Sequence, residues 1–389
     1  MNPMDMSERQ RVLALLRYQH YDRLPIVHFG YWQETLDKWA EEGHVTVTEA
    51  REWRDGNPTD RRVSARLGFD LDWHTIFGPS VRLDPGFERT VVQEFADGSR
   101  HVLDRNGVVI QEKPGAGSIP AEVEHTLTDR ESWEKHYKWR YQWKEERVTT
   151  AHVLVGDSYL RWDDGGLEFL QRDERDFLYG LFCGSLYGQI RDVVGLVGSA
   201  YLQVDDEELF DEIIDTVGDL CYRTTKYVLE AGARFDFAHF WEDIAFKTGP
   251  LVAPTVFREK VGPHYRRITD VVREHGIDIV SLDCDGKIDE LIPIWLENGV
   301  NTMFPIEGGT WNASIEPWRA QYGSELRGVG GTNKTVFSKD RAAVEEEVDR
   351  VSRLVELGGY IPCPDHRIPP DAEWELVSYY CELLRERFS

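Results

Sequence analysis

The sequence predicts an α/β fold, a (β/α)8 TIM barrel with an N-terminal helical segment and an inserted β-meander. The second half of the chain alternates short apolar runs with helix-patterned segments, which is typical of parallel strands joined by helices. Eight such runs occur along the 389 residues, the number that closes a barrel. No GxGxxG or GxxxxGK[ST] sequence is present, which disfavours an open, nucleotide-binding doubly wound sheet.

The predicted strands are short apolar runs bounded by polar or turn residues. In chain order they cover residues 26–29, 73–77, 178–182, 235–240, 277–282, 300–304, 326–329 and 359–362. Helix patterns lie between them, and one long helix carries an apolar face made of Phe210, Ile213, Ile214, Val217 and Cys221. The order strand, helix, strand predicts a parallel sheet.

Capping patterns predict two helices in the first part of the chain. Ser7 and Gln10 form a capping box ahead of an apolar run, and residues 22–25 then break the helix pattern before the first strand. Thr128 and Glu131 repeat the capping box and predict a charged, Trp-rich helix that reaches about residue 147.

An insertion separates the second and third strands. Residues 90–112 predict a β-meander, because the turn dipeptides Asp97-Gly98 and Asn106-Gly107 separate short β-branched runs. The stretch 114–120, PGAGSIP, predicts a loop. The meander is compatible with a lid over one barrel end or with an arm in a homodimer. Since residues 1–150 show no sign of a separate core, we treat residues 1–389 as a single barrel domain.

Composition excludes several classes of partner. Lys and Arg total 45 against 70 Asp and Glu, and the formal charge of −25 repels nucleic acid and anionic membranes. No run reaches the roughly 18 apolar residues of a membrane span, and the N-terminus has no signal-peptide pattern, so we expect a cytoplasmic protein. Five scattered cysteines with no CxxC pair argue against disulfides and a zinc ribbon.

Catalytic residues of a barrel lie where strands end at the carboxyl face, and polar side chains follow every predicted strand here. In chain order they are His28, Tyr31 and Trp32; His74; Tyr187; His239, Glu242 and Asp243; Asp283 and Asp285; Glu307; Asn333 and Lys334; Asp365, His366 and Arg367. Carboxylates and imidazoles that converge in a barrel mouth can bind a metal or exchange protons.

Each candidate also has a structural interpretation. A lone histidine in a strand, such as His28 or His239, is equally compatible with a hydrogen-bonded core residue. His366 is favoured as functional because a charged triplet before the rigid Ile-Pro-Pro sequence is costly to bury, although an ion pair with Asp365 is the alternative. Asp283 and Asp285 point to one side of extended backbone and bind metal, or else form an Asx turn into the next helix.

The cysteines are predicted to pack in the core and not to react. Cys284 points away from its two aspartate neighbours, and Cys183, Cys221 and Cys381 fall on apolar faces. Cys363 lies nearest the predicted mouth, and its role stays open.

Five stretches in order along the chain resemble the uroporphyrinogen-decarboxylase-like superfamily, which also holds cobalamin-linked methyltransferases. They are RVLALLRYQHYDRLPIVHFGYW, GSLYGQIRDVVG, WEDIAFKTGPLVAPTVF, DCDGKIDELIPIWLENGVN and GGYIPCPDHRIPPD, and they span most of the sequence. The resemblance implies one barrel domain over the whole chain.

The chain departs from both branches of that superfamily. Decarboxylases resemble one another in an RQAGR-like motif after the first strand, where this chain has HFGYWQET, and His74 comes closest to the place of their aspartate after the second strand. The methyltransferase branch uses zinc on a His-x-Cys pair and a later Cys, positions that here hold Asp283, Asp285 and His366. Two carboxylates and an imidazole suit an oxygen substrate, a folate or a different metal better than a thiolate.

The resemblance therefore implies a corrinoid-linked methyltransferase or demethylase component that acts on a small methylated or methoxylated substrate. Its expected cofactors are a divalent metal, zinc or another, a corrinoid on a partner protein, and tetrahydrofolate. The alternative is a decarboxylase that acts on a tetrapyrrole or a smaller acid, and the second alternative is a non-catalytic ligand-binding barrel.

The implied roles fall into three sets. The metal ligands are Asp283, Asp285 and His366, and the catalytic residues are His366, Glu242, Asp243 and Glu307. The substrate-binding residues are His28, Trp32, His74, Tyr187, His239, Asn333, Lys334 and Arg367.

Overall fold

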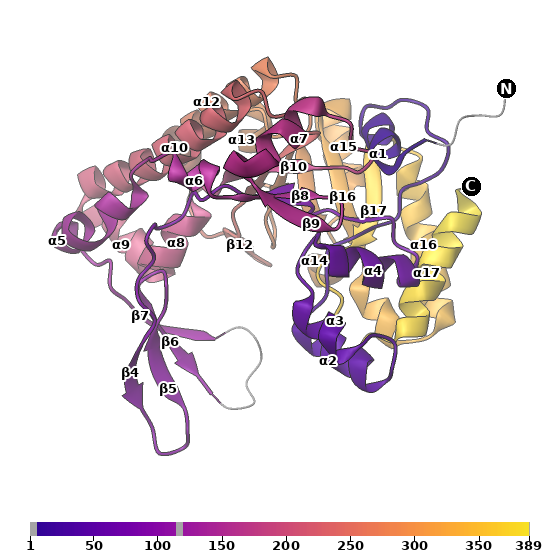
Figure 1. Cartoon of the computed structure of the whole chain (residues 1–389), viewed down its shortest axis with the longest axis horizontal. Coiled ribbons are helices and arrows are strands. Elements are labelled where there is room, and N and C mark those ends of the chain that lie inside the picture. Colours follow the sequence, from indigo (N-terminus) through magenta and orange to yellow (C-terminus); the bar gives the residue numbers. More distant parts are fainter. Residues whose placement is uncertain (1–5, 114–119, 389) are drawn as a thin grey trace.

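The computed structural model describes residues 6–113 and 120–388 and shows a parallel sheet surrounded by helices (Figure 1). Seven strands form the main sheet, in the spatial order β17 (Tyr360–Pro364), β16 (Arg327–Thr332), β15 (Thr302–Ile306), β14 (Val280–Asp283), β11 (Phe237–Trp241), β10 (Gly180–Gly184) and β3 (Ile76–Phe77). All neighbours in it pair in parallel, as predicted. Two further strands, β1 (Val27–His28) and β2 (Leu71–Asp72), form a separate parallel pair.

Each of the eight predicted strands overlaps an observed strand, but within the second, predicted over 73–77, only β3 (Ile76–Phe77) is a strand, and β2 (Leu71–Asp72) precedes the predicted range. The prediction of one strand over 73–77 is wrong because a turn interrupts it. The Asp72 carboxylate accepts hydrogen bonds from the backbone N–H of His74 at 2.8 Å and of Gly56 at 3.0 Å, which takes the chain out of the extended conformation. This turn brings the His74 side chain to the end of the sheet.

Short links connect the β1–β2 pair to both ends of the main sheet. β2 continues into β3 through the turn, and Gly180 N–H donates to Thr75 O at 3.0 Å. At the other end Tyr31 and Ile368 form a parallel bridge, and Ile368 N–H donates to Gly30 O at 3.0 Å. Within the described residues, the strands of this parallel region form an open seven-stranded sheet and a separate two-stranded sheet.

Helices pack around the sheet. The α-helices are α1 (Glu8–Leu16), α2 (Gln33–Glu41), α3 (Val47–Glu52), α4 (Pro58–Leu67), α7 (Leu167–Arg172), α8 (Gly188–Val194), α9 (Leu196–Asp205), α10 (Glu207–Glu230), α11 (Pro254–Val256), α12 (Gly262–Glu274), α13 (Ile292–Glu297), α14 (Gly308–Trp311), α15 (Ile315–Tyr322), α16 (Arg341–Val355) and α17 (Trp374–Arg387). Short helical turns add η3 (Trp162–Gly166), η4 (Phe257–Val261), η5 (Gly323–Glu325) and η6 (Lys334–Ser338). None of the helices in the described part of the chain is long and apolar enough to cross a membrane.

Two helix predictions are confirmed in detail. The capping box of Ser7 and Gln10 is present at the start of α1, with both reciprocal hydrogen bonds formed. The predicted apolar face of α10 is buried, since its five residues, Phe210, Ile213, Ile214, Val217 and Cys221, are at most 1% exposed. Local capping chemistry and the 3.6-residue period thus predict these helices well.

The predicted helix from Thr128 to about residue 147 is wrong. Asp129, and not Thr128, caps the segment by accepting the N–H of Ser132 at 2.8 Å. The chain then passes through four short pieces, α5 (Arg130–Ser132), η1 (Trp133–Tyr137), η2 (Lys138–Tyr141) and α6 (Glu146–Thr149). Trp133, Tyr137 and Tyr141 are all buried, so tertiary packing of these rings overrides the regular helix that the caps suggest.

The predicted β-meander is an antiparallel sheet that projects from the body as an arm (Figure 1). Its strands are β4 (Thr90–Glu94), β5 (Arg100–Leu103), β6 (Val108–Glu112) and a fourth strand beyond the predicted range, β7 (Ala121–His125). Residues 114–119, part of the predicted loop, lie outside the described residues. Two hairpins complete the fold: β8 (His152–Val155) with β9 (Ser158–Arg161), and β12 (Ala245–Phe246) with β13 (Gly249–Pro250).

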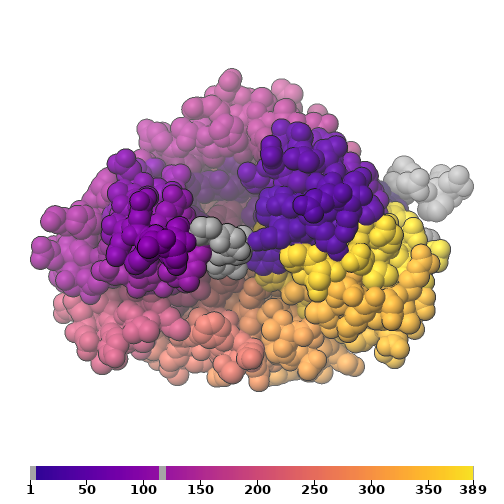
Figure 2. Space-filling view, turned by 90° about the horizontal axis from the view of Figure 1, so that it is seen from below, coloured from indigo at the N-terminus to yellow at the C-terminus, as the bar shows by residue number. Residues whose placement is uncertain are grey.

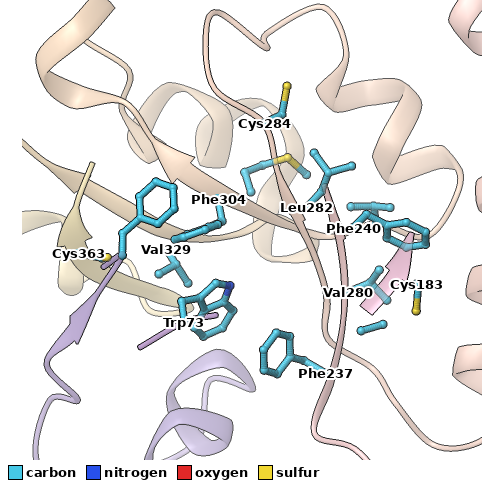
Figure 3. Close-up of a cluster of buried hydrophobic side chains, with 14 of the residues drawn as sticks. Trp73, Cys183, Phe237, Phe240, Val280, Leu282, Cys284, Phe304, Val329 and Cys363 are labelled. Carbon is cyan, nitrogen blue, oxygen red and sulfur yellow. The ribbon is translucent and has the colours of Figure 1, made fainter. Parts of the chain in front are cut away.

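The core fills the space inside the curved sheet (Figure 3). Trp73 packs on Phe237 with ring centroids 4.8 Å apart, and its Nε1 donates to Ser281 Oγ at 3.0 Å. All five cysteines are buried and free, as the packing prediction requires for Cys183, Cys221, Cys284 and Cys381. Cys363, which the sequence left open, is also fully buried.

Candidate functional site

A cavity of about 580 Å³ opens where the strands end at their carboxyl side. Figure 2 views the molecule from this side and shows it hollowed between the arm and the N-terminal segment. The cavity is lined by Phe29, Trp32, Asp55, His74, Ile76, Arg82, Phe182, His239, Trp241, Asp243, Asp283, Asp285, His366 and Arg367. Its size and its mixture of aromatic and charged side chains are typical of a small-molecule site.

His74 and Asp283 form the most deeply placed ion pair of the cavity. His74 Nε2 lies 3.0 Å from Asp283 Oδ2. Burial opposes protonation of the imidazole, but the hydrogen bond and charge of Asp283, helped by Asp55 and Asp72, outweigh it and raise the pKa of His74 to about 9. His74 therefore carries a proton at neutral pH, and its buried Nδ1 has no hydrogen-bond partner among the described residues.

Three carboxylates gather beside this pair. Asp243, Asp283 and Asp285 each offer an oxygen within 4.8 Å of the others. Burial, together with the negative charges of Asp285 and Asp283, raises the pKa of Asp243 to about 8. Asp243 also has a φ of 50°, a strained left-handed conformation for a non-glycine residue, and such strain is concentrated at functional sites.

Asp285 connects the carboxylates to the last strand. Its Oδ2 lies 3.2 Å from His366 Nε2, while its buried Oδ1 has no partner among the described residues. The His366 ring stacks on Trp32 with centroids 5.4 Å apart and meets Phe29 edge-on at 5.2 Å. Aromatic packing thus fixes the imidazole in place beside Asp285.

Arg367 is paired with Asp55, a residue of the loop between α3 and α4 that was not among the predicted site residues. Its two terminal nitrogens pair with Asp55 Oδ1 and Oδ2, each at 2.7 Å. This bidentate geometry is the strong form of an arginine–carboxylate pair, and it commits the guanidinium to Asp55.

Among the described sets of side chains that could hold a metal ion, two overlapping sets consist only of residues that line the cavity. One is His74, His239 and Asp283, and the other is Asp243, Asp283 and Asp285. Of the predicted metal ligands, Asp283 and Asp285 belong to the second set together with Asp243, while His366 lies beside it, with its Nε2 at 3.2 Å from Asp285 Oδ2. Burial, with the nearby His74 cation, holds the pKa of His239 well below its usual value, so its imidazole is neutral and suited to ligation.

The donor atoms of the two sets are carboxylate oxygens and imidazole nitrogens, and neither set contains a sulfur. Cys284, between the two aspartates, is fully buried, and its sulfur faces the backbone N–H of Ile244 at 3.4 Å. Cys363 is equally buried, with its sulfur 3.4 Å from Pro364 O. Neither thiol lines the cavity, so thiolate ligation has no support from this geometry.

Six predicted site residues lie outside the cavity lining: His28, Tyr187, Glu242, Glu307, Asn333 and Lys334. Glu242 is fully buried, and its carboxylate accepts hydrogen bonds from the N–H groups of Leu186, Tyr187 and Gly188 and from the Tyr265 hydroxyl. It satisfies the N-terminus of α8 and does not face a ligand.

The other five also serve neighbouring backbone or core groups. Glu307 accepts from Gly286 N–H at 2.6 Å, and Asn333 Oδ1 accepts from Thr335 N–H at 3.0 Å. His28 is enclosed beside Ser64 Oγ at 2.9 Å, and Tyr187 is 3% exposed. Lys334 Nζ faces Asp365 at 3.7 Å. A position just after a strand end predicts that a residue lies near the cavity, but whether its side chain faces the cavity depends on the path of its loop.

Asp55 and Arg82 are the charged lining residues that the sequence reasoning missed. Asp55 lies in the loop between α3 and α4, and Arg82 lies five residues beyond the end of β3. Asp55 is far from every predicted strand end. Arg82 lies five residues after the predicted second strand, the same distance that separates Tyr187, Lys334 and Arg367 from theirs, so distance along the chain does not explain why it was missed.

Comparisons with known proteins agree with the fold. Residues 198–387 match the family model described as uroporphyrinogen decarboxylase (URO-D). A methyltransferase from Methanosarcina mazei is similar in structure, with a TM-score of 0.59 at 16% sequence identity, covering 98% of this chain and 99% of that one. The match over residues 198–387 supports the resemblance to the uroporphyrinogen-decarboxylase-like superfamily that the sequence predicts.

A second structural similarity is too weak to support an argument. A B12-independent methionine synthase from a Shewanella species, in complex with selenomethionine, has a TM-score of 0.43 and 10% identity, over 94% of this chain and 98% of that chain. A search of the curated proteins found no match.

Proposed function

We propose that this protein is an enzyme that removes a methyl group from a small methylated or methoxylated compound and transfers it to a corrinoid carried by a partner protein, with tetrahydrofolate as the alternative acceptor. The observation that carries the proposal is the convergence of Asp243, Asp283, Asp285, His74 and His366 in one cavity without a cysteine sulfur. The similarity to an archaeal methyltransferase over almost the whole chain supports it by analogy of fold.

The residues fit a divalent metal, zinc or another. Asp285 Oδ1 is buried without a partner, and the mutual repulsion of the three carboxylates raises the pKa of Asp243 to about 8, a cost that a cation would relieve. Asp243, Asp283 and Asp285 would hold the ion, with His74 or His239 beside them. When bound, it would act as a Lewis acid toward an oxygen or nitrogen of the substrate.

The chain's own residues would manage the proton on the departing group. His74 holds a proton between its Nε2 and Asp283 at 3.0 Å, and His366 Nε2 lies at 3.2 Å from Asp285. An oxygen or nitrogen that loses its methyl group gains negative charge, and an adjacent imidazolium stabilises that charge or donates the proton. Trp32 and Phe29 shield one side of this region from water.

The eight strand positions support a closed (β/α)8 barrel that forms one domain with its inserted arm. The bridge between Tyr31 and Ile368 and the continuous path from β2 into β3 bring the two sheets edge to edge on both sides. In such a barrel the cavity lies at the catalytic face. A homodimer in which the arm contacts a second copy stays a prediction.

The direct test uses free cobalamin in place of the partner. Purified protein would be analysed for bound metal and then mixed with cob(I)alamin and a panel of methoxylated aromatics and methylated amines. We expect a stoichiometric metal and conversion of the cobalamin to its methylated form with at least one compound. Asp285→Asn should abolish both, whereas Asp278→Asn, which changes a half-exposed carboxylate at the amino end of the same strand, should abolish neither.

A decarboxylase of a small acid is the second candidate, and the raised pKa of Asp243 favours it. A carboxyl group that is protonated near neutral pH can deliver a proton to the carbon that loses carbon dioxide. Release of carbon dioxide from an aromatic or short-chain acid, without any methylation of cobalamin, would support this reading over methyl transfer. Binding without either reaction would favour the non-catalytic ligand-binding barrel.

A further inference from the structure

The cavity has a wall that is apolar and carries one cation, and it lies beside the carboxylates, since Trp241 pairs with Asp283 across β11 and β14. This wall consists of Arg82, Ile76, Phe182 and Trp241. Ile76, Phe182 and Trp241 come from the neighbouring strands β3, β10 and β11, whose pairing places their side chains on one side of the cavity. The chemistry of this wall, an apolar surface with one cation, differs from that of the neighbouring carboxylates and imidazoles, which offer oxygen and nitrogen donors.

Arg82 is fixed at this wall by the residues around it. Val81 and Leu83, its neighbours, are buried in the core, and the buried guanidinium of Arg147 donates to the Arg82 carbonyl at 2.8 Å. The Arg82 side chain is exposed, and its guanidinium carbon lies 5.9 Å from the centre of the Trp241 ring. The backbone is thus anchored while the charged end is free to meet a ligand.

Arg82 differs from the other basic side chains of the cavity in its pairing. Arg367 is bound to Asp55 at 2.7 Å, His74 to Asp283 at 3.0 Å and His366 to Asp285 at 3.2 Å. Arg82 forms no ion pair within 4 Å in residues 6–113 and 120–388. Asp192, which feels the charge of Arg82, is already paired with Arg191 at 2.6 Å. The cavity therefore offers one uncommitted cation.

We infer that the substrate is a planar, ring-sized compound with a single carboxylate, which Arg82 binds while the ring lies against Phe182 and Trp241 and the reacting group faces Asp243, Asp283 and Asp285. This inference rests on the proposed function for the identity of the reacting group. We expect only one carboxylate on the substrate, because a second anionic group would have to face the three aspartates, whose negative charge would repel it. The polycarboxylated tetrapyrroles that give the superfamily its name do not meet this condition.

The geometry along β11 supports the ring size. Trp241 ends the strand, and Asp243 follows two residues later, so the chain separates them by at most about 7 Å. A six-membered ring with a substituent at each end spans a comparable distance. One end can thus meet Arg82 over Trp241 while the other reaches the carboxylates.

The test compares binding of an acid and its neutral isostere, read by titration calorimetry without turnover. The probes are 4-methoxybenzoate, 4-methoxybenzamide and the dianion benzene-1,4-dicarboxylate, with metal-free protein. We expect the acid to bind at least about tenfold more tightly than the amide and than the dianion. Arg82→Gln should remove the preference for the acid, and Arg82→Lys should retain part of it.

A matched variant controls for the loss of positive charge as such. Arg100→Gln, on the arm, removes an arginine that pairs with Glu112 and should leave all three affinities within about twofold of the unchanged protein. Equal weakening of acid and amide in Arg82→Gln would overturn the inference, as would failure of both to bind the unchanged protein at millimolar concentration.

Two outcomes separate this inference from the proposed function. If 4-methoxybenzoate binds through Arg82 but no methyl group reaches cobalamin from any compound, the carboxylate subsite stands and methyl transfer is wrong. If 4-methoxybenzoate is demethylated equally well by the unchanged protein and by Arg82→Gln, methyl transfer stands and the subsite is wrong.

Discussion

Two clusters of imidazole and carboxylate side chains lie close together in this molecule, and they differ in their exposure to the cavity. His28, Asp60 and Asp72 form one, and His74, Asp243, Asp283 and Asp285 form the other. Both bring together groups that could hold a metal ion. Only the second contributes to the lining of the cavity.

The polar atoms of the buried cluster mainly contact neighbouring groups of the protein. Asp60 accepts from Trp53 Nε1 at 2.7 Å and Ser64 Oγ at 3.2 Å, and its second oxygen lies 3.5 Å from His28 Nε2. His28 Nδ1 accepts from Gly30 N–H at 3.0 Å. Asp60 Oδ2 forms no hydrogen bond within the described residues, but its cluster does not line the cavity. His74 Nδ1 and Asp285 Oδ1 also lack hydrogen-bond partners there, and they belong to residues that line the cavity. Similar residue types therefore stabilise the fold in one place and are available to a ligand in the other.

The largest expected effect belongs to Asp283, which is common to both metal-capable sets. Asp283→Ala removes the partner of His74 and a donor of each set, so activity on the identified substrate should fall by about 1,000-fold. Steady-state kinetics would measure it, with Asp278→Ala as the control. A loss of less than tenfold would show that the reaction occurs elsewhere.

In the buried cluster the effect should fall on stability. Asp60→Ala leaves the Trp53 N–H without its acceptor and removes the carboxylate that faces His28, and we expect the free energy of unfolding to decrease by about 3 kcal/mol. Urea denaturation measures this change. Activity per folded molecule should stay within a few-fold of the unchanged protein, and a large loss of it would contradict the separation of the two clusters.

The clusters should also respond to pH in different ranges in metal-free protein. Asp243 has a pKa of about 8 when folded against 3.8 in its ordinary state, and His74 about 9 against 6.5. In both cases the folded state holds protons that the unfolded state has lost, so stability decreases as pH rises, up to about pH 8 for Asp243 and pH 9 for His74. Asp72, raised to about 6 mainly by burial, contributes only below about pH 6.

Denaturation between pH 5 and 9.5 tests this difference. Asp243→Asn should flatten the decline between pH 6 and 8 and raise stability at pH 7.5 by at least about 1.4 kcal/mol, the equivalent of one pKa unit. Asp72→Asn should leave the slope above pH 6 unchanged. An unchanged slope between pH 6 and 8 in Asp243→Asn would show that its carboxyl is ionised in the folded protein.

The smallest effect is expected at Cys284. Cys284→Ala removes a buried sulfur that faces the backbone, so it should cost about 1 kcal/mol of stability and leave activity and metal content within about threefold. Thermal unfolding and elemental analysis measure both. Loss of metal in this variant would show that the thiol, and not the carboxylates, is a ligand.

Sequence reasoning predicted the strands better than the site. The eight apolar runs appear in the predicted order because burial on both faces of a parallel strand leaves a continuous apolar signal. The division of the second strand was not predictable, since it depends on Asp72 accepting the N–H of Gly56, which lies 16 residues earlier. The prediction of one regular helix after Thr128 is wrong for a similar reason, because the packing of buried aromatic rings determines the path of the chain there.

Adjacent residues show where site prediction from sequence ends. Glu242 and Asp243 both follow β11, yet Glu242 binds the backbone at the start of α8 while Asp243 faces the cavity. Arg82 and Arg367 are both cavity arginines, but Asp55 neutralises only Arg367. No local pattern distinguishes the members of either pair.

The sequence by itself determined the α/β class, the order of the strands, and the caps and apolar faces of several helices, because these depend on the spacing of residues within one segment. The tertiary structure decided which carboxylates meet, which histidine each one holds and which arginine stays unpaired. These properties depend on the register and rotation of segments that are distant in the chain, and on burial that shifts the pKa of each group only after the segments meet.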